Sequence, residues 1–232
     1  MLRISSIRTL CALVATTVLS AVPASAQSIP SPYRFIEEGQ EGGLFAGYFN
    51  ADAGRFGFGP KSGLATGARY GLELSGPIGL EGVATLAPVG RDVINPGRDE
   101  GDRIVDEAES AILFLEVRLR LALTGRRTWH GLQPYFFAGG GAGLDVRGNQ
   151  AEDQLLSEAD RFNFGTKFLG TTGGGVRVML PGRFVLRLDA AMMLYQLQTP
   201  SGFLDPLRNL GDVPENEWVS AKTLSLGLAY RF

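Results

Sequence analysis

The 232-residue chain is close to charge balance, with 22 Lys and Arg against 24 Asp and Glu and a formal net charge of −2. This balance lacks the basic footprint of a nucleic-acid-binding protein. The one cysteine, Cys11, lies in the N-terminal segment, so a disulfide framework cannot replace a hydrophobic core. The length is suited to one domain.

The N-terminal segment has the three parts of a secretory signal peptide. Arg3 and Arg8 make it basic, an uncharged run extends from Thr9 to Val22, and Ala24-Ser25-Ala26 is a small-residue cleavage site. A membrane anchor is the alternative, but a spanning helix needs about 20 apolar residues and this run is shorter. We therefore expect residues 1–26 to be removed after Ala26 on export through the secretory pathway.

Beyond this segment, the hydrophobic pattern repeats every two residues, as in β-strands. The clearest case is Ala111 to Leu123, where leucines alternate with Glu116, Arg118 and Arg120. A helix would scatter these three charges around its circumference. The eight predicted strands are Gly43–Asn50, Leu64–Ser75, Ile78–Ala87, Ala111–Leu123, Gln133–Val146, Asn163–Leu180, Phe184–Leu197 and Val219–Phe232.

Short and long connections alternate between these strands. The short turns are Gly76-Pro77 and Pro181-Gly182-Arg183, with an intermediate turn at 124–132, and the long polar connections are 51–63, 88–110, 147–162 and 198–218. This alternation is typical of barrels with short periplasmic turns and long extracellular loops. We expect a short periplasmic tail at 27–41 and the barrel domain at 42–232.

The C-terminal strand ends in a recognisable pattern. Ser225, Gly227, Tyr230 and Phe232 resemble the assembly signal of bacterial outer-membrane β-barrels. Together with the strand and loop pattern, the chain resembles the small eight-stranded OmpA/OmpX-type barrels. The resemblance ends at Phe232, without the peptidoglycan-binding domain that follows the barrel in OmpA-type proteins.

This resemblance implies an all-β fold, an eight-stranded antiparallel transmembrane β-barrel with up-and-down meander topology, located in the bacterial outer membrane. It implies a structural or surface-interaction role without a cofactor, an enzymatic activity or nucleic acid as a partner. The expected partners are outer-membrane lipid and lipopolysaccharide, with the barrel-assembly machinery and periplasmic chaperones during biogenesis. The pattern predicts no particular oligomeric state.

If the apolar face of each strand meets lipid, the charged face points into the barrel and should form an ion-pair network. Two alternatives remain: a narrow small-solute or ion channel, and a soluble lipocalin-like barrel whose apolar face lines a ligand cavity. The predicted interior charges are Arg69, Glu73, Glu81, Glu116, Arg118, Arg120, Lys167, Arg177, Arg187, Asp189 and Arg231.

Three other features invite a chemical interpretation. His130 is the only histidine and lies in a predicted periplasmic turn, so we interpret it as a surface residue. The acidic segment 97–109 does not have the spacing of an EF-hand and is expected to be a solvated loop without a metal. The glycine runs at 139–143 and 170–175 lie inside strands, where aromatics such as Phe137 or Phe168 could cover bare backbone.

Overall fold

The computed structural model describes residues 31–148 and 150–232, of which Pro32–Phe232 form one compact unit. The predicted signal peptide and residues 27–30 of the predicted tail lie outside the described residues. Within the described part of the chain, no helix is long and apolar enough to span a membrane.

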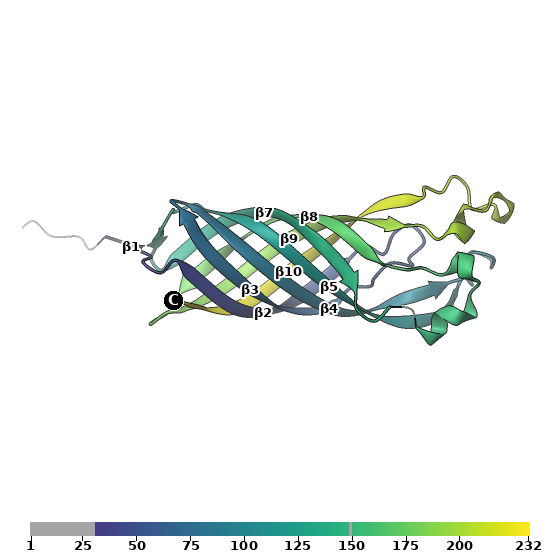
Figure 1. Cartoon of the computed structure of the whole chain (residues 1–232), viewed down its shortest axis with the longest axis horizontal. Helices are drawn as coiled ribbons and strands as arrows, with labels where there is room; N and C mark the ends of the chain where they lie inside the picture. Colours follow the sequence, from purple (N-terminus) through teal and green to yellow (C-terminus); the bar gives the residue numbers. More distant parts are fainter. Residues whose placement is uncertain (1–30, 149) are drawn as a thin grey trace, which may run out of the picture. The chain divides into compact units, whose positions relative to one another are not determined.

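Eight long strands form a closed antiparallel barrel, which confirms the predicted fold class. Each strand pairs with its neighbour along the chain, and β10 pairs with β2 to close the barrel, with Leu228 opposite Leu44. Figure 1 shows the tilted strands around a common axis. They are β2 (Gln40–Ala51), β3 (Gly63–Ser75), β4 (Ile78–Ile94), β5 (Ile104–Ala122), β7 (Leu132–Asp145), β8 (Thr166–Met179), β9 (Phe184–Gln198) and β10 (Asn216–Arg231).

Two further short strands lie beside the turns. Strand β1 (Tyr33–Phe35) pairs with β6 (Arg127–Trp129), and the Ile36 N–H donates to the Arg126 carbonyl oxygen at 3.0 Å. Strand β2 begins at Gln40, earlier than the predicted Gly43. Part of the predicted tail is therefore folded against the turn end, which we define as the end with the β3–β4, β5–β7 and β8–β9 turns.

The prediction that residues 88–110 form a loop is wrong. Strand β4 continues to Ile94 and β5 already begins at Ile104, so the two strands form a longer hairpin. Val89, Val93 and Ala108 are buried on one face of the hairpin, while Glu107 and Glu109 are exposed on the other. The two-residue period is present here, but the density of charges and glycines hides it in the sequence. The connection itself is limited to residues 95–103.

The other long loops pack together at the opposite, loop end of the barrel. Phe58, Phe162 and Phe203 come from three different loops, and the Phe58 ring lies 4.8 Å from Phe162 and 5.5 Å from Phe203 between centroids. These loops carry the short 3-10 helices η1 (Ala151–Leu155), η2 (Glu158–Asp160), η3 (Ser201–Leu204) and η4 (Pro206–Arg208). The loops therefore form a packed cap with an aromatic core.

The outward faces of the strands form an apolar belt. On β10, the outward residues from Leu224 to Phe232 are 43 to 59% exposed, and they alternate with buried or lumen-facing Ser225, Ala229 and Arg231. Near the turn end, Tyr70 contacts Phe232 and Phe184 contacts Tyr230. Large apolar side chains thus cover the surface that a membrane protein presents to lipid.

Candidate functional site

The barrel lumen contains most of the charged side chains that the sequence predicts for it. Glu73 keeps a side chain only 8% exposed, whereas Lys167 is half-buried near the loop end and makes no ion pair with the described residues. The buried predicted residues are Arg69, Glu81, Glu116, Arg118, Arg120, Arg177, Arg187, Asp189 and Arg231.

Glu81 lies at the centre of these charges. Its Oε1 accepts hydrogen bonds from Arg120 Nη1 and from Arg187 Nη1, both at 2.8 Å. Arg187 Nη2 also donates to the Tyr135 hydroxyl at 2.7 Å, and Arg120 pairs with Glu73. These contacts join β3, β4, β5, β7 and β9 across the lumen. The ion pairs matter there because a buried charge without an oppositely charged partner costs much free energy.

Glu41 is the network residue that the sequence analysis missed. One carboxylate oxygen accepts from Arg177 and the other lies 3.0 Å from Arg187 Nη1. Glu41 lies two residues before Gly43 and four before Phe45, on the same face of β2. The two-residue alternation would have predicted that Glu41 points into the barrel if the predicted strand had begun before Gly43. With Glu41 included, the paired carboxylates and guanidinium groups inside the barrel balance in charge.

The lumen network is the set of paired, buried Arg and acidic side chains inside the barrel. It contains as many carboxylates as guanidinium groups, and a separate pair, Arg231 with Glu38, lies at the turn end at 2.9 Å. Its members are Glu41, Arg69, Glu73, Glu81, Glu116, Arg118, Arg120, Arg177, Arg187 and Asp189.

Two phenylalanines sit between glycines and arginines inside the barrel. Phe137 lies opposite Gly173, where an added Cβ would be 2.6 Å from its ring, and the Arg118 guanidinium lies 4.6 Å above that ring. Phe45 has the same relation to Gly67 and to Arg69, the latter at 4.5 Å. The glycine therefore gives the ring room, and the ring supports the cation. The expectation for Phe168 is wrong, because it points outward and is 83% exposed.

The half of the lumen nearer the loops is apolar instead of charged. Phe49, Phe114, Met193 and Tyr195 are almost fully buried there, and the Phe49 and Phe114 rings are 5.5 Å apart. Tyr135 and Tyr195 both point inward and are 2% and 0% exposed. A cavity between the charged and apolar layers measures only about 20 Å³. Side chains therefore fill the lumen.

One ion pair fastens the cap to the barrel, and a second joins two loops within the cap. Arg91, on the inner face of the extended hairpin, pairs with buried Asp153 of η1. Arg208 of η4 pairs with Asp160 of η2, and this hydrogen bond raises the pKa of Arg208. Loop segments far apart in the sequence are thus tied by charge as well as by aromatic packing.

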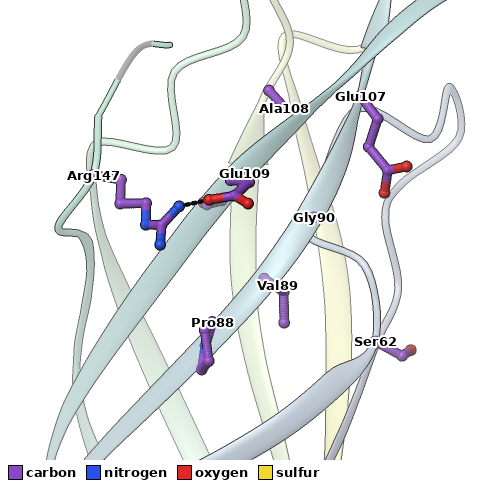
Figure 2. Close-up of a pocket in the computed structure, with 9 residues that line it drawn as sticks. Ser62, Pro88, Val89, Gly90, Glu107, Ala108, Glu109 and Arg147 are labelled. Atoms are coloured by element: carbon purple, nitrogen blue, oxygen red, sulfur yellow. Dashed lines mark ion pairs between the residues drawn. The ribbon is translucent and has the colours of Figure 1, made fainter.

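A polar hollow of about 530 Å³ lies on the outer face of the β4–β5 hairpin, just beyond the apolar belt. Figure 2 shows Arg147 reaching Glu109 on one side of Gly90, with Ser62 and Glu107 on the other. Lys61 binds Glu107 at 3.0 Å and Asp92 at 2.7 Å. The hydrogen bond to Asp92 raises the pKa of Lys61, so its ammonium group is charged at neutral pH.

The remaining candidate residues have simpler surroundings. His130 is exposed in its turn, has a φ of 51° and contacts the Trp129 ring edge-on. The described residues contain no cluster of three or more His, Cys, Asp or Glu side chains suited to a metal ion. Of the predicted assembly signal, Ser225 and Gly227 face the lumen, while Tyr230 and Phe232 face outward.

Comparison with known proteins agrees with this architecture. No protein-family model and no curated protein sequence matches the chain. Among solved structures, Neisserial surface protein A (NspA) has a TM-score of 0.50 at 12% identity, covering 83% of this chain and 97% of its own. The fold is that of a small outer-membrane β-barrel.

Two structures from Pseudomonas aeruginosa are also similar. The outer membrane protein OprG shares 15% identity, covers 84% of this chain and 96% of its own, and has a TM-score of 0.48. The N-terminal β-barrel domain of OprF shares 12% identity, covers 84% and 98%, and has a TM-score of 0.44. At these identities the similarity concerns the fold alone.

Proposed function

We propose that the protein is an integral protein of the bacterial outer membrane with a structural or surface-interaction role. The observation that carries this proposal is the inverted distribution of its side chains. Residues such as Leu119 and Leu226 are more than half exposed on the outside, while Arg177 and Arg187 are almost fully buried inside. Only a hydrocarbon environment makes such an exterior favourable.

The same distribution argues against a lipocalin-like binding barrel. A soluble barrel of that kind has an apolar lumen and a hydrated exterior. Here the charged half of the lumen is occupied by ion pairs, and the apolar half is filled by rings such as Phe49 and Phe114. The packed lumen also disfavours the channel alternative, because ions would have to displace both layers.

The surface role is supported by the folded cap at the loop end. Ordered loops, joined by Phe58, Phe162 and Phe203, present a defined surface at the end opposite the turns. We propose that this end is extracellular, that outer-membrane lipid and lipopolysaccharide surround the barrel, and that the barrel-assembly machinery and periplasmic chaperones act during biogenesis. In this role the protein is not an enzyme and needs no cofactor.

Cell fractionation tests the localisation. The full-length chain is expressed in a Gram-negative host, the membranes are separated, and the protein is electrophoresed with and without boiling. We expect recovery in the outer membrane and a heat-dependent mobility shift. Recovery as a soluble periplasmic protein would contradict the proposal.

Planar-bilayer recording tests the channel alternative on the same purified protein. The packed lumen predicts no steady conductance at neutral pH. A reproducible, voltage-independent conductance from correctly folded protein would replace the structural role with a channel function.

A further inference from the structure

The segment before β2 is attached to opposite sides of the barrel at its turn end. The Ile36 N–H donates to the Arg126 carbonyl oxygen in the β5–β7 turn at 3.0 Å, and the Gly39 carbonyl oxygen accepts from the Glu73 N–H of β3 at 2.8 Å. Around the barrel wall, β5 is three strands from β2 in one direction, and β7 is four strands from it in the other. Residues 32–39, which we call the strap, therefore connect opposite sides of the barrel.

The strap is too short to follow the rim of the barrel. Gln40 is four residues after Ile36, a distance of at most about 14 Å in a fully extended chain. Three strand spacings of about 4.8 Å, widened along the rim by a tilt of about 45°, make roughly 20 Å. The strap therefore passes over the opening. Figure 1 shows β1, which belongs to the strap, at the same end of the barrel as the C-terminus.

The strap has one buried side chain, and it points toward the opening. Ile36 is 3% exposed, whereas the neighbouring Phe35 is 61% exposed. Thr128 of β6 is opposite Arg34 and is also 3% exposed. Because Arg34 and Ile36 are two residues apart, Thr128 and Ile36 share one face of the β1–β6 pair. This buried face is turned toward the barrel, and the opposite face is exposed.

Polar contacts hold the strap on several sides of the opening. One guanidinium nitrogen of Arg126 donates to two carbonyl oxygens of the strap, at 3.3 and 3.2 Å. One Glu38 oxygen lies 2.9 Å from Arg231 at the end of β10, and the other lies 3.8 Å from Arg183 in the β8–β9 turn. The strap is therefore attached to β3, to β10 and to two of the turns.

The charged half of the lumen begins next to the strap. Gln133, near the start of β7, is 1% exposed and accepts a hydrogen bond from Arg177. Arg177 also pairs with Glu41, the second residue of β2. Without the strap these groups would meet water from the turn end. The apolar half of the lumen, with Phe49 and Phe114, would stay packed.

We infer that the strap is a lid for the turn-end opening of the barrel. In place, it keeps water from the charged half of the lumen. When it is released, it opens a charged vestibule that ends blindly at the apolar layer. One buried apolar side chain and a few hydrogen bonds hold the strap, so its release should require less free energy than unfolding of the barrel. This lid goes beyond the structural role proposed above, because it controls access to the lumen.

Cysteine accessibility of the exported full-length chain, purified in detergent micelles, tests the lid. The only cysteine, Cys11, is replaced by serine, and one reporter cysteine is introduced at a time. Gln133→Cys and Thr128→Cys report on the covered opening. His130→Cys is the exposed reference, and Met193→Cys reports on the apolar half. The probe is a small charged methanethiosulfonate reagent, and mass spectrometry follows the labelling.

Ile36→Asp is the first release variant, because it places an unpaired charge on the buried face of the strap. Phe35→Asp is its matched control, since this exposed side chain lies beside Arg126 and opposite Arg127, which can pair with the new charge. Arg126→Met is a second release variant that removes the donor to two strap carbonyl oxygens. Heat-dependent gel mobility shows whether each variant is folded.

With the strap unchanged, we expect both covered reporters to be labelled at least about tenfold more slowly than His130→Cys. Ile36→Asp and Arg126→Met should each speed the labelling of Gln133→Cys by about tenfold, and Phe35→Asp should leave it unchanged. Met193→Cys should stay unlabelled in every variant, because the apolar layer does not depend on the strap.

Fast labelling of Gln133→Cys with the strap unchanged would overturn the proposal. A labelling rate that neither release variant increases would also overturn it. Labelling of Met193→Cys in a release variant would contradict the blind vestibule. The micelle measurement does not depend on the location of the protein in the cell, so failure of the lid is distinguishable from failure of fractionation to the outer membrane.

Discussion

Glu41 Oε1 lies 3.0 Å from Arg187 Nη1, and this contact joins β2 to β9 across β10, which lies between them in the barrel wall. The other Glu41 oxygen binds Arg177 of β8. Hydrogen bonds in the wall connect only adjacent strands, so this carboxylate links strands that the wall itself does not.

Glu41→Gln should therefore be strongly destabilising. It removes one charge from a balanced, buried set, and loss of one partner of a buried ion pair costs about 3–5 kcal/mol. Urea unfolding of the protein in lipid vesicles measures the change. Glu38→Gln is the matched comparison, because the side chains of Glu38 and its partner Arg231 are 23% and 11% exposed, and it should cost less than Glu41→Gln.

The double variant Glu41→Leu/Arg177→Met separates charge balance from a specific need for the ion pair. Replacing a buried pair with apolar side chains is often neutral or stabilising, so we expect most of the lost stability to return. A double variant less stable than Glu41→Gln would contradict this explanation.

Gly175→Ala should destabilise the barrel by about 1–3 kcal/mol through overpacking. A Cβ at this position would lie 2.4 Å from an Asp189 carboxylate oxygen and 2.4 Å from the Leu188 carbonyl oxygen, and the backbone cannot move easily. Gly170→Ala on the same strand meets open space and is expected to be neutral. Thermal unfolding followed by gel mobility compares the two variants, and similar midpoints would count against tight lumen packing at Gly175.

Asp153→Asn should loosen the cap while the barrel stays folded. Arg91 would remain buried without its carboxylate, which favours opening of residues 146–165. Limited proteolysis of intact cells or vesicles should show faster cleavage in this loop than in the unchanged protein. The neighbouring Glu152→Gln, which removes a half-buried charge without breaking the Arg91 pair, should leave the cleavage rate unchanged.

Lys61 should titrate above the usual lysine pKa of about 10.4. Its pKa is raised in the folded protein, so its ion pairs contribute stability below the unfolded pKa and lose that contribution as the pH rises through the folded value. Asp92→Asn should lower the pKa, since it removes the hydrogen bond that raises it most. Side-chain NMR of Lys61 measures both values, and an unchanged pKa in the variant would refute this cause.

The sequence by itself determined the strands and the face that each side chain occupies. Alternation such as Glu116, Arg118 and Arg120 among leucines is a local property, because successive side chains of a strand point to opposite sides. The same rule places Leu224 and Leu226 outside and Arg231 inside, as the structure has them. Its failures were at boundaries: β2 starts earlier, and the charged residues after Ala87 continue the hairpin.

Only the tertiary structure decided which charges meet and how the loops pack. The contact of Glu41 with Arg187 depends on the register of several strands and on closure of β10 with β2, none of which is encoded in a local repeat. The joining of Phe58 to Phe203, and of Arg91 to Asp153, likewise depends on chain segments far apart in sequence. Local alternation selects a face, whereas side-chain partners across a barrel are set by the closed geometry.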